Sequence, residues 1–145
     1  MSYLLRTLSS ILILISCTCT HALDQNILNE IDLSWTMQSN DVSVASVSGN
    51  EKSNGMYIYR VRFPKGHKIM PHYHSDERVV TVISGSLYVG YGNVFDVSKM
   101  TKLVPGGLWT EPKETAHFVW AKDGEVELQV VGFGPSVRTS ISEKK

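Results

Sequence analysis

The sequence predicts an all-β domain. Short runs in which apolar and polar residues alternate begin at Val42 and recur to about residue 133. Turns such as Asn54-Gly55 and Gly92-Asn93 separate these runs, and no long segment of helical spacing interrupts them. Alternation of this kind is typical of strands with one buried face, and evenly spaced strands form a sandwich or a barrel. With 145 residues, the chain is long enough for one hydrophobic core.

The expected strands follow the alternating runs in order. Within 56–63, alternate residues from Tyr57 to Phe63 share one face, because successive side chains of a strand point to opposite sides. Ser84-Gly85 is expected to form a tight hairpin turn, because glycine tolerates a positive φ. We expect strands at 42–48, 56–63, 68–74, 78–84, 86–91, 101–104, 108–111, 116–121 and 125–133.

The residues before Val42 have a different character. Residues 1–22 resemble a secretory signal peptide: the apolar run 8–15 is too short to span a bilayer, and Thr20-His21-Ala22 offers a cleavage site. We therefore expect cleavage near Ala22 and a secreted or periplasmic protein. Residues 23–41 are expected to form an arm or a short helix that packs on the domain, because their apolar residues recur at helical spacing.

Both cysteines of the chain, Cys17 and Cys19, lie in the expected signal peptide. The mature domain would then contain no disulfide, and its stability would come from its core. An alternative follows from Leu14-Ile15-Ser16-Cys17, which resembles a bacterial lipoprotein processing box and would leave Cys17 as a lipid anchor. Either interpretation takes the protein out of the cytoplasm.

The charge pattern excludes some classes of function. The chain has 14 basic and 14 acidic residues and no basic stripe, so the sequence offers no electrostatic basis for binding nucleic acid. It has no nucleophile elbow, phosphate-binding loop or catalytic cysteine. The run of Asp123, Glu125 and Glu127 is expected to form a solvated face.

Three histidines are the most informative residues. His72 and His74 occupy alternate positions of the expected strand 68–74, so their imidazoles share one face. His117, from a distant strand, can complete a facial metal site, because neutral imidazole binds several first-row metal ions. Taken singly, His72 and His74 could instead be surface residues of an edge strand, and His117 could be a structural histidine.

The two histidine segments resemble the two sequence motifs of the cupin superfamily. The resemblance covers about residues 56–133 and implies a jelly-roll β-barrel, here expected over 42–137 with a tail at 138–145. It also implies a divalent transition metal (Fe, Mn, Zn or Ni) held by His72, His74 and His117. The matching residues are Gly66, His72, His74 and Gly85 in the first motif, and Gly106, Pro112 and His117 in the second.

One departure from the family pattern affects the chemistry of the site. Arg78 stands where the family has an acidic ligand, and Glu77 is its immediate neighbour. If Arg78 points inward, it cannot ligate a metal, but its guanidinium can bind a substrate carboxylate. If a bulge shifts the register by one residue, Glu77 points inward as a fourth ligand or general base. We favour Glu77, because a metal dication attracts a carboxylate.

Strand alternation places Phe118 and Trp120 on the opposite face from His117, outside the domain. Two large aromatic side chains on an outer face need a cover. We expect the cover to be either the N-terminal segment with Ile31 and Trp35, or a second copy of the chain in a homodimer.

The sequence supports two main hypotheses of function. The first is a metal-dependent enzyme of small-molecule metabolism outside the cytoplasm, dioxygenase-like or of another metal-centred chemistry, in which Glu77 and Arg78 act beside the metal. The second is a non-enzymatic cupin that binds or senses a small ligand or a metal, because fold does not fix function. A third and weaker hypothesis is an interaction protein that uses its outward aromatic residues and binds no metal.

Overall fold

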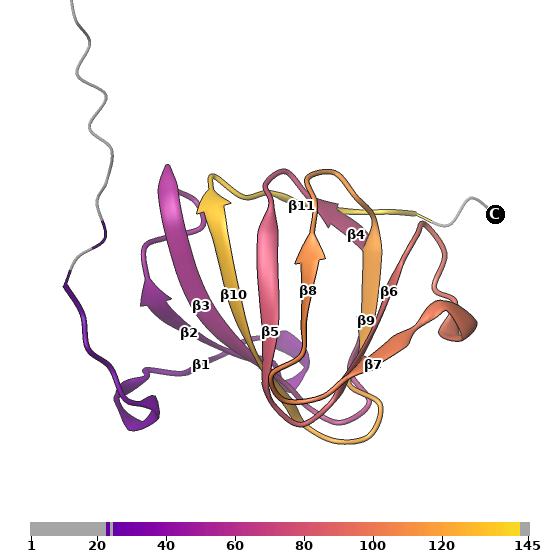
Figure 1. The fold of residues 1–145 in the computed structure, drawn as a ribbon, viewed down its shortest axis with the longest axis horizontal. Helices are drawn as coiled ribbons and strands as arrows, with labels where there is room; N and C mark the ends of the chain where they lie inside the picture. The colour runs from indigo at the N-terminus through magenta and orange to yellow at the C-terminus, as the bar shows by residue number, and fades with distance from the viewer. Residues whose placement is uncertain (1–22, 24, 143–145) are drawn as a thin grey trace, which may run out of the picture.

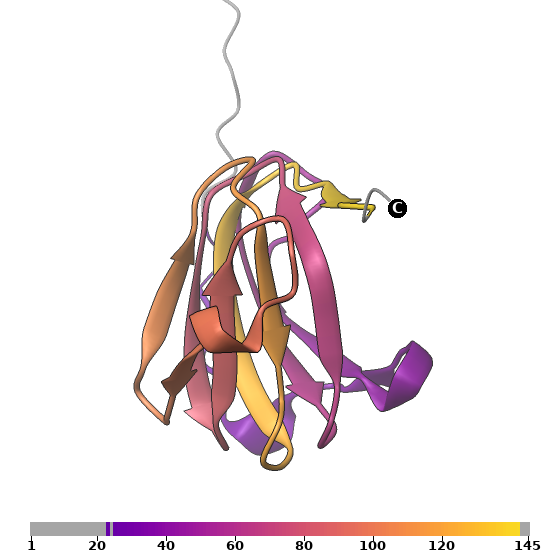
Figure 2. The same cartoon turned by 90° about the vertical axis from the view of Figure 1, so that its right-hand side faces the viewer.

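A six-stranded and a five-stranded antiparallel sheet face each other in the computed structural model of the chain, which describes residues 23 and 25–142 (Figures 1 and 2). The larger sheet has the order β1 (Thr36–Met37), β2 (Ser43–Ser48), β3 (Gly55–Phe63), β10 (Val126–Gly134), β5 (Arg78–Ser84) and β8 (Leu108–Glu111). The smaller sheet has the order β11 (Arg138–Ser140), β4 (Lys68–His74), β9 (His117–Trp120), β6 (Leu87–Tyr91) and β7 (Thr101–Leu103). Three short 3-10 turns complete the described elements: η1 (Glu30–Asp32), η2 (Ser39–Asp41) and η3 (Val97–Lys99).

From β3 to β6 the chain crosses between the two sheets at each successive strand, and it does so again from β7 to β11. This alternation is the jelly-roll arrangement, so the predicted all-β fold class is confirmed. The two sheets keep separate hydrogen-bonded ladders in the described residues and do not close into one continuous barrel. Every strand expected between residues 42 and 133 is present, with ends that differ by at most one residue.

The hydrophobic core lies between the inner faces of the two sheets. On β3 the predicted alternation holds: Tyr57, Val61 and Phe63 are buried. Burial of these apolar side chains removes their surface from water, which is the main force that holds the sheets together. The core cluster comprises Tyr57, Val61, Phe63, Val80, Val82, Leu87, Val89, Trp109, Val119, Ala121, Val126, Leu128 and Val130.

On the outer face of β3 and β10, Glu127 is buried rather than solvated as expected. Its carboxylate accepts hydrogen bonds from Arg60 Nη1 and Arg62 Nε, each at 2.9 Å, and only 4% of the residue is exposed. The two arginines stand opposite β10, so their guanidinium groups close over Glu127. The sequence analysis judged Glu127 from the acidic residues near it in the chain, and so it missed the pairing with arginines of the neighbouring strand.

The N-terminal segment is an arm rather than a helix. It contains η1 and η2, and β1 joins it to the edge of the larger sheet through β2. Arg62 anchors it by an ion pair with Glu30 at 3.0 Å and by lying 3.9 Å from the centre of the Trp35 ring. Ile31 is 92% exposed, so this part of the arm extends away from the sheets (Figure 1).

The outer aromatic residues of β9 are covered by the chain itself, but not by the N-terminal arm. Phe118 is fully buried beneath Phe95, at a centroid distance of 5.2 Å, and Phe95 also lies 6.4 Å from Trp120. Gly90 leaves the room that Phe118 needs, because a Cβ there would lie 2.6 Å from its ring. The expected cover by Ile31 and Trp35 was therefore wrong. Homodimerisation stays a prediction, but it no longer rests on a need to cover these rings.

A strand that the sequence interpretation missed lies in the expected tail. β11 pairs with the edge of β4 and places Arg138 opposite His74 and Ser140 opposite His72. The segment Arg138–Ser140 is short, polar and exposed, so it has no alternation of apolar and polar residues that would identify it. Its docking extends the smaller sheet beside the histidines.

The expected signal peptide, with Cys17 and the lipid-anchor alternative, lies outside the described residues. In the part of the chain that is described, none of the helical segments has the length and apolar character needed to cross a membrane.

Substituting Phe118 with Ala should lower the free energy of unfolding by about 3–5 kcal/mol, because it removes a fully buried ring and leaves a cavity under Phe95. Urea unfolding followed by far-UV circular dichroism would measure the change. Phe118→Leu, which keeps most of the apolar volume, is the matched control and should cost clearly less. An unfolding free energy of Phe118→Ala within error of wild type would show that Phe118 is not part of the packed structure.

Candidate metal centre

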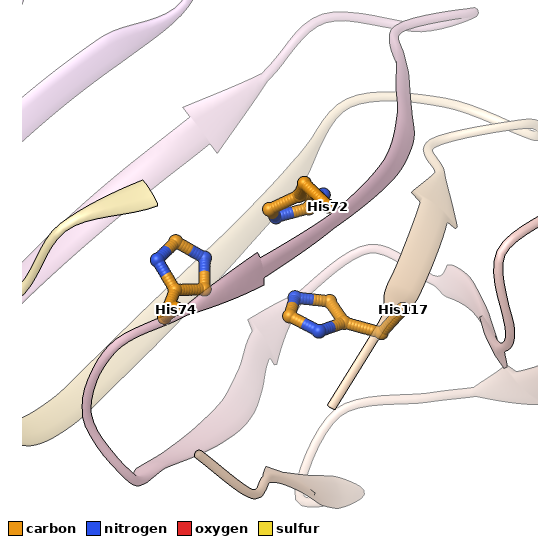
Figure 3. Close-up of side chains that lie close together, drawn as sticks. All are labelled: His72, His74 and His117. Atoms are coloured by element: carbon orange, nitrogen blue, oxygen red, sulfur yellow. The ribbon is translucent and has the colours of Figure 1, made fainter. Parts of the chain in front are cut away.

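The three predicted histidines meet between the sheets. His72 and His74 lie on β4 and His117 begins β9, and one ring nitrogen of each lies within 4.8 Å of the others. Figure 3 shows the three imidazoles pointing toward one another. Their residues are 4%, 7% and 1% exposed, so they are not surface histidines of an edge strand.

A bulge in β4 turns both histidines of this strand inward. Ile69 pairs with Val119, and His72 pairs with His117. Between these two pairs β4 advances by three residues and β9 by two, so β4 contains one extra residue. Ile69 and His72 therefore both face the interior, although an odd spacing would place them on opposite faces of a regular strand. Pro71 lies in the irregular segment, where its missing N–H costs no ladder hydrogen bond.

Backbone carbonyls orient two of the rings. Nδ1 of His72 lies 2.9 Å from the carbonyl oxygen of Met70, and Nδ1 of His117 lies 3.1 Å from that of Thr115. A carbonyl oxygen only accepts, so in each ring Nδ1 carries the proton and donates it. In the His72 ring, Nε2 is then left with a free lone pair, which is the usual arrangement of a metal-binding imidazole.

The environment keeps His72 and His74 neutral. Burial, and then the nearby His117, lowers the pKa of His72 to about 4. Burial, and then the positive charge of Arg78, lowers the pKa of His74 to about 3. At neutral pH both rings are therefore unprotonated, as metal ligation requires.

The carboxylate of the site comes from Glu111, which the sequence interpretation did not select. Glu111 ends β8, and its Oε1 lies 3.1 Å from His117 Nε2 while its Oε2 lies 3.8 Å from His74 Nε2. Burial alone would raise the pKa of Glu111, but His117 and Arg78 outweigh it and lower this pKa to about 2. A negative charge is therefore held next to two of the three imidazoles.

Arg78, rather than the favoured Glu77, points into the site. β5 begins at Arg78, which is 6% exposed and stands directly opposite Glu111 on β8. Arg78 Nε lies 2.8 Å from Glu111 Oε2, and Nη1 donates a hydrogen bond to the hydroxyl of Tyr59 at 3.1 Å. Glu77 is exposed and does not line the cavity. No bulge interrupts β5 at this point, so Arg78 retains the inward direction that strand alternation gives it.

Several buried polar atoms of the site lack aligned hydrogen bonds. They are His117 Nε2, Glu111 Oε2 and Arg78 Nε. His117 Nε2 lies 3.1 Å from Glu111 Oε1, and Arg78 Nε lies 2.8 Å from Glu111 Oε2. Buried polar groups are almost always hydrogen bonded, so such a concentration indicates that another group completes the site. Three imidazole nitrogens with an adjacent carboxylate are a donor set that suits a divalent transition metal.

The site opens into a cavity of about 750 Å³ between the sheets. This volume is in the range of small-molecule sites. The wall combines apolar and aromatic residues with polar ones, and the polar residues include the three histidines, Arg78, Arg138 and Glu111. Apolar and aromatic residues that line it include Val44, Tyr59, Phe63, Val80, Trp109 and Leu128.

The family model described as Cupin matches residues 25–144 of the sequence. No curated protein matches the sequence significantly.

Solved structures share the fold at low sequence identity. KdgF from Halomonas sp. is 16% identical with a TM-score of 0.63, over 76% of this chain and 94% of that one. A sugar phosphate isomerase of the cupin superfamily from Silicibacter pomeroyi is 18% identical with a TM-score of 0.61, over 82% and 83%. A variant of salicylate 1,2-dioxygenase from Pseudoaminobacter salicylatoxidans is 12% identical with a TM-score of 0.59, over 71% of this chain and 31% of that one. At these identities the similarity shows the fold alone.

The low pKa values of His72 and His74 predict acid sensitivity of the metal-free protein. Imidazoles in the unfolded chain bind protons near the ordinary pKa of 6.5, whereas the folded protein resists protonation until about pH 4 and about pH 3. Between these limits the unfolded state binds more protons, so the free energy of unfolding should fall as pH is lowered from 7 to 4.

Urea unfolding in the presence of a chelator, repeated across this pH range, would measure the effect. His72→Gln removes one of the two groups and should make the decline shallower than in wild type. Equal slopes for the two proteins would contradict the buried, neutral state of His72.

Proposed function

The chain belongs to the cupin family, and from that premise we propose that it is an exported, metal-dependent protein that acts on a small molecule in its interior cavity. The observation that carries the proposal is the inward convergence of three buried imidazoles, two with Nδ1 bonded to a carbonyl. His72, His74 and His117 would hold a divalent transition metal such as Fe, Mn, Zn or Ni. A metal bound there supplies Lewis-acid or redox chemistry, with coordination positions left for a ligand.

Glu111 takes the acidic role for which the sequence suggested Glu77. Its carboxylate lies 3.1 Å from His117 Nε2, so it can serve as a fourth ligand or accept a proton from a bound molecule. Arg78 is its positioning residue: Arg78 Nε holds one carboxylate oxygen, and Tyr59 holds Nη1 of the same guanidinium. This arrangement restrains the Glu111 side chain beside the imidazoles.

The fold does not select one reaction, because proteins that share it differ in activity. Structures of this fold include a sugar phosphate isomerase and a salicylate 1,2-dioxygenase. We favour a dioxygenase-like or other metal-centred reaction, since the donor set leaves coordination positions open beside a cavity of small-molecule size.

The alternative is a cupin that binds or senses a ligand without turning it over, and a cavity of about 750 Å³ is large enough for such a ligand. Incubation of the metal-loaded protein with candidate substrates under air, with product analysis, distinguishes the two functions. Binding without any product would support the non-enzymatic function.

Export is supported by the sequence of residues 1–22, with its short apolar run and the small residues at Thr20 and Ala22. The proposed location is the periplasm or the extracellular space, and processing at Cys17 with a lipid anchor is the second possibility. Mass spectrometry of the mature N-terminus would separate a cut after Ala22 from a lipid-modified Cys17.

The double variant His72→Ala/His117→Ala should lose the metal, because it removes two of three ligands. Elemental analysis of protein purified without chelator or added metal would measure the content, with near-stoichiometric metal expected in the wild type. His67→Ala is the matched control, since His67 lines the same cavity and is not part of the three-histidine cluster. Unchanged metal in the double variant, or none in the wild type even after reconstitution, would refute the metal site.

Glu111→Gln should weaken metal binding by about 10- to 100-fold, because a carboxylate that contacts or orients the ligands is replaced by a neutral amide. Competition against a chelator of known affinity would measure the change. Glu77→Gln removes the same charge from an exposed neighbour of Arg78 and should leave the affinity unchanged. A larger effect of Glu77→Gln than of Glu111→Gln would return the acidic role to Glu77.

A further inference from the structure

Two guanidinium groups line the cavity, and they differ in what holds them. Arg78 forms an ion pair with Glu111 and donates a hydrogen bond to the hydroxyl of Tyr59. Arg138 lies on β11 and makes no ion pair or hydrogen bond through its side chain with any of the described residues. Of the two arginines that line the cavity, Arg78 is therefore already paired, whereas the guanidinium N–H groups of Arg138 have no partner among the described residues and can bind a ligand.

The register of β11 brings Arg138 to the metal centre. Arg138 stands directly opposite His74 in the antiparallel β4–β11 pair, and directly opposed residues project their side chains to the same face. Since His74 points into the cavity, Arg138 shares that direction, and it is among the residues that line the cavity wall. Its position is beside the imidazole cluster, at the exposed edge of the smaller sheet.

Within residues 25–142, no acidic side chain forms an ion pair with Arg138. The negative charge of Glu111 is paired with Arg78. Glu51, exposed at the rim, makes no ion pair with Arg138, and the ammonium of Lys68 lies over the Trp120 ring on the outer face of the sheet, 4.4 Å from its centroid. Partial burial, and then the nearby positive charge of Arg78, lowers the pKa of Arg138.

From this arrangement we propose that the cavity binds a small organic carboxylate, with the carboxylate held by Arg138. The planar fork of an arginine matches the two oxygens of a carboxylate. The apolar and aromatic wall, which includes Phe63 and Trp109, would accept the hydrocarbon part of the molecule. This inference rests on the proposed function and deepens it, because it names the class of molecule that reaches the three histidines.

The test compares benzoate with benzamide, which has the same ring and no charge. Isothermal titration calorimetry in a low-salt buffer without carboxylates would measure both affinities for wild type, Arg138→Gln and Arg138→Lys. Lys99→Gln is the control, because Lys99 carries the same charge on η3, has an exposed side chain and does not line the cavity. Arg138 is exposed on a three-residue edge strand, so its substitution should leave the fold intact, which circular dichroism would verify.

Wild type should bind benzoate at least about tenfold more tightly than benzamide, because a hydrogen-bonded ion pair is lost with the amide. Arg138→Gln should lose about tenfold in benzoate affinity with benzamide unchanged, and Arg138→Lys should fall between the two. Lys99→Gln should behave as wild type. Equal affinities for the two probes, no detectable benzoate binding, or an Arg138→Gln variant that binds benzoate as tightly as Lys99→Gln would overturn the inference.

Elemental analysis of the same samples separates the two proposals. If the protein holds no metal but binds benzoate in an Arg138-dependent way, the metal-dependent function fails and the carboxylate site stands. If the metal is present in wild type and in Arg138→Gln, but benzoate affinity does not depend on Arg138, only the carboxylate site fails.

Discussion

The pairing of β4 with β9 is the constraint on which the candidate site depends. It sets His72 directly opposite His117, and the bulge between Ile69 and His72 turns the end of β4 so that His74 also faces inward. Because the rings are held by backbone pairing and by carbonyls at Met70 and Thr115, they keep their positions without help from a ligand. The site is therefore preorganised by the sheet that carries it, which is the condition for tight and geometrically selective metal binding.

Burial of so many polar groups in one place requires compensation, and the opposite sheet provides it. His72 and His74 avoid most of the cost of burying a charge, because their pKa values lie well below neutrality. Within the site, the buried carboxylate of Glu111 lies opposite the buried guanidinium of Arg78 on adjacent strands of the larger sheet. Each sheet thus contributes a different part: the smaller sheet supplies the three histidines, and the larger sheet supplies an ion pair beside them.

This chain has the histidines of the cupin sequence pattern at the matching positions, but its acidic residue stands at a different position. Arg78 occupies the strand position where the cupin pattern has a carboxylate, and the carboxylate here comes from Glu111 on the neighbouring strand. Antiparallel pairing makes such an exchange possible, because directly opposite residues reach the same region of the interior. The site keeps a negative charge near the imidazoles and gains a buried positive one.

The sequence by itself determined the all-β class, the strands from Ser43 to Gly134 to within about a residue, and the three histidines, since each of these follows from local alternation or from motif spacing. Only the tertiary structure decided the residues that act through pairing between strands distant in the sequence. Strand order and register bring three such pairs together. Glu111 lies beside His117, Glu127 forms an ion pair with Arg60, and Arg138 stands opposite His74. A one-residue difference in register reverses every side chain of a strand, so the choice between Glu77 and Arg78 required the three-dimensional pairing of β5 with β8.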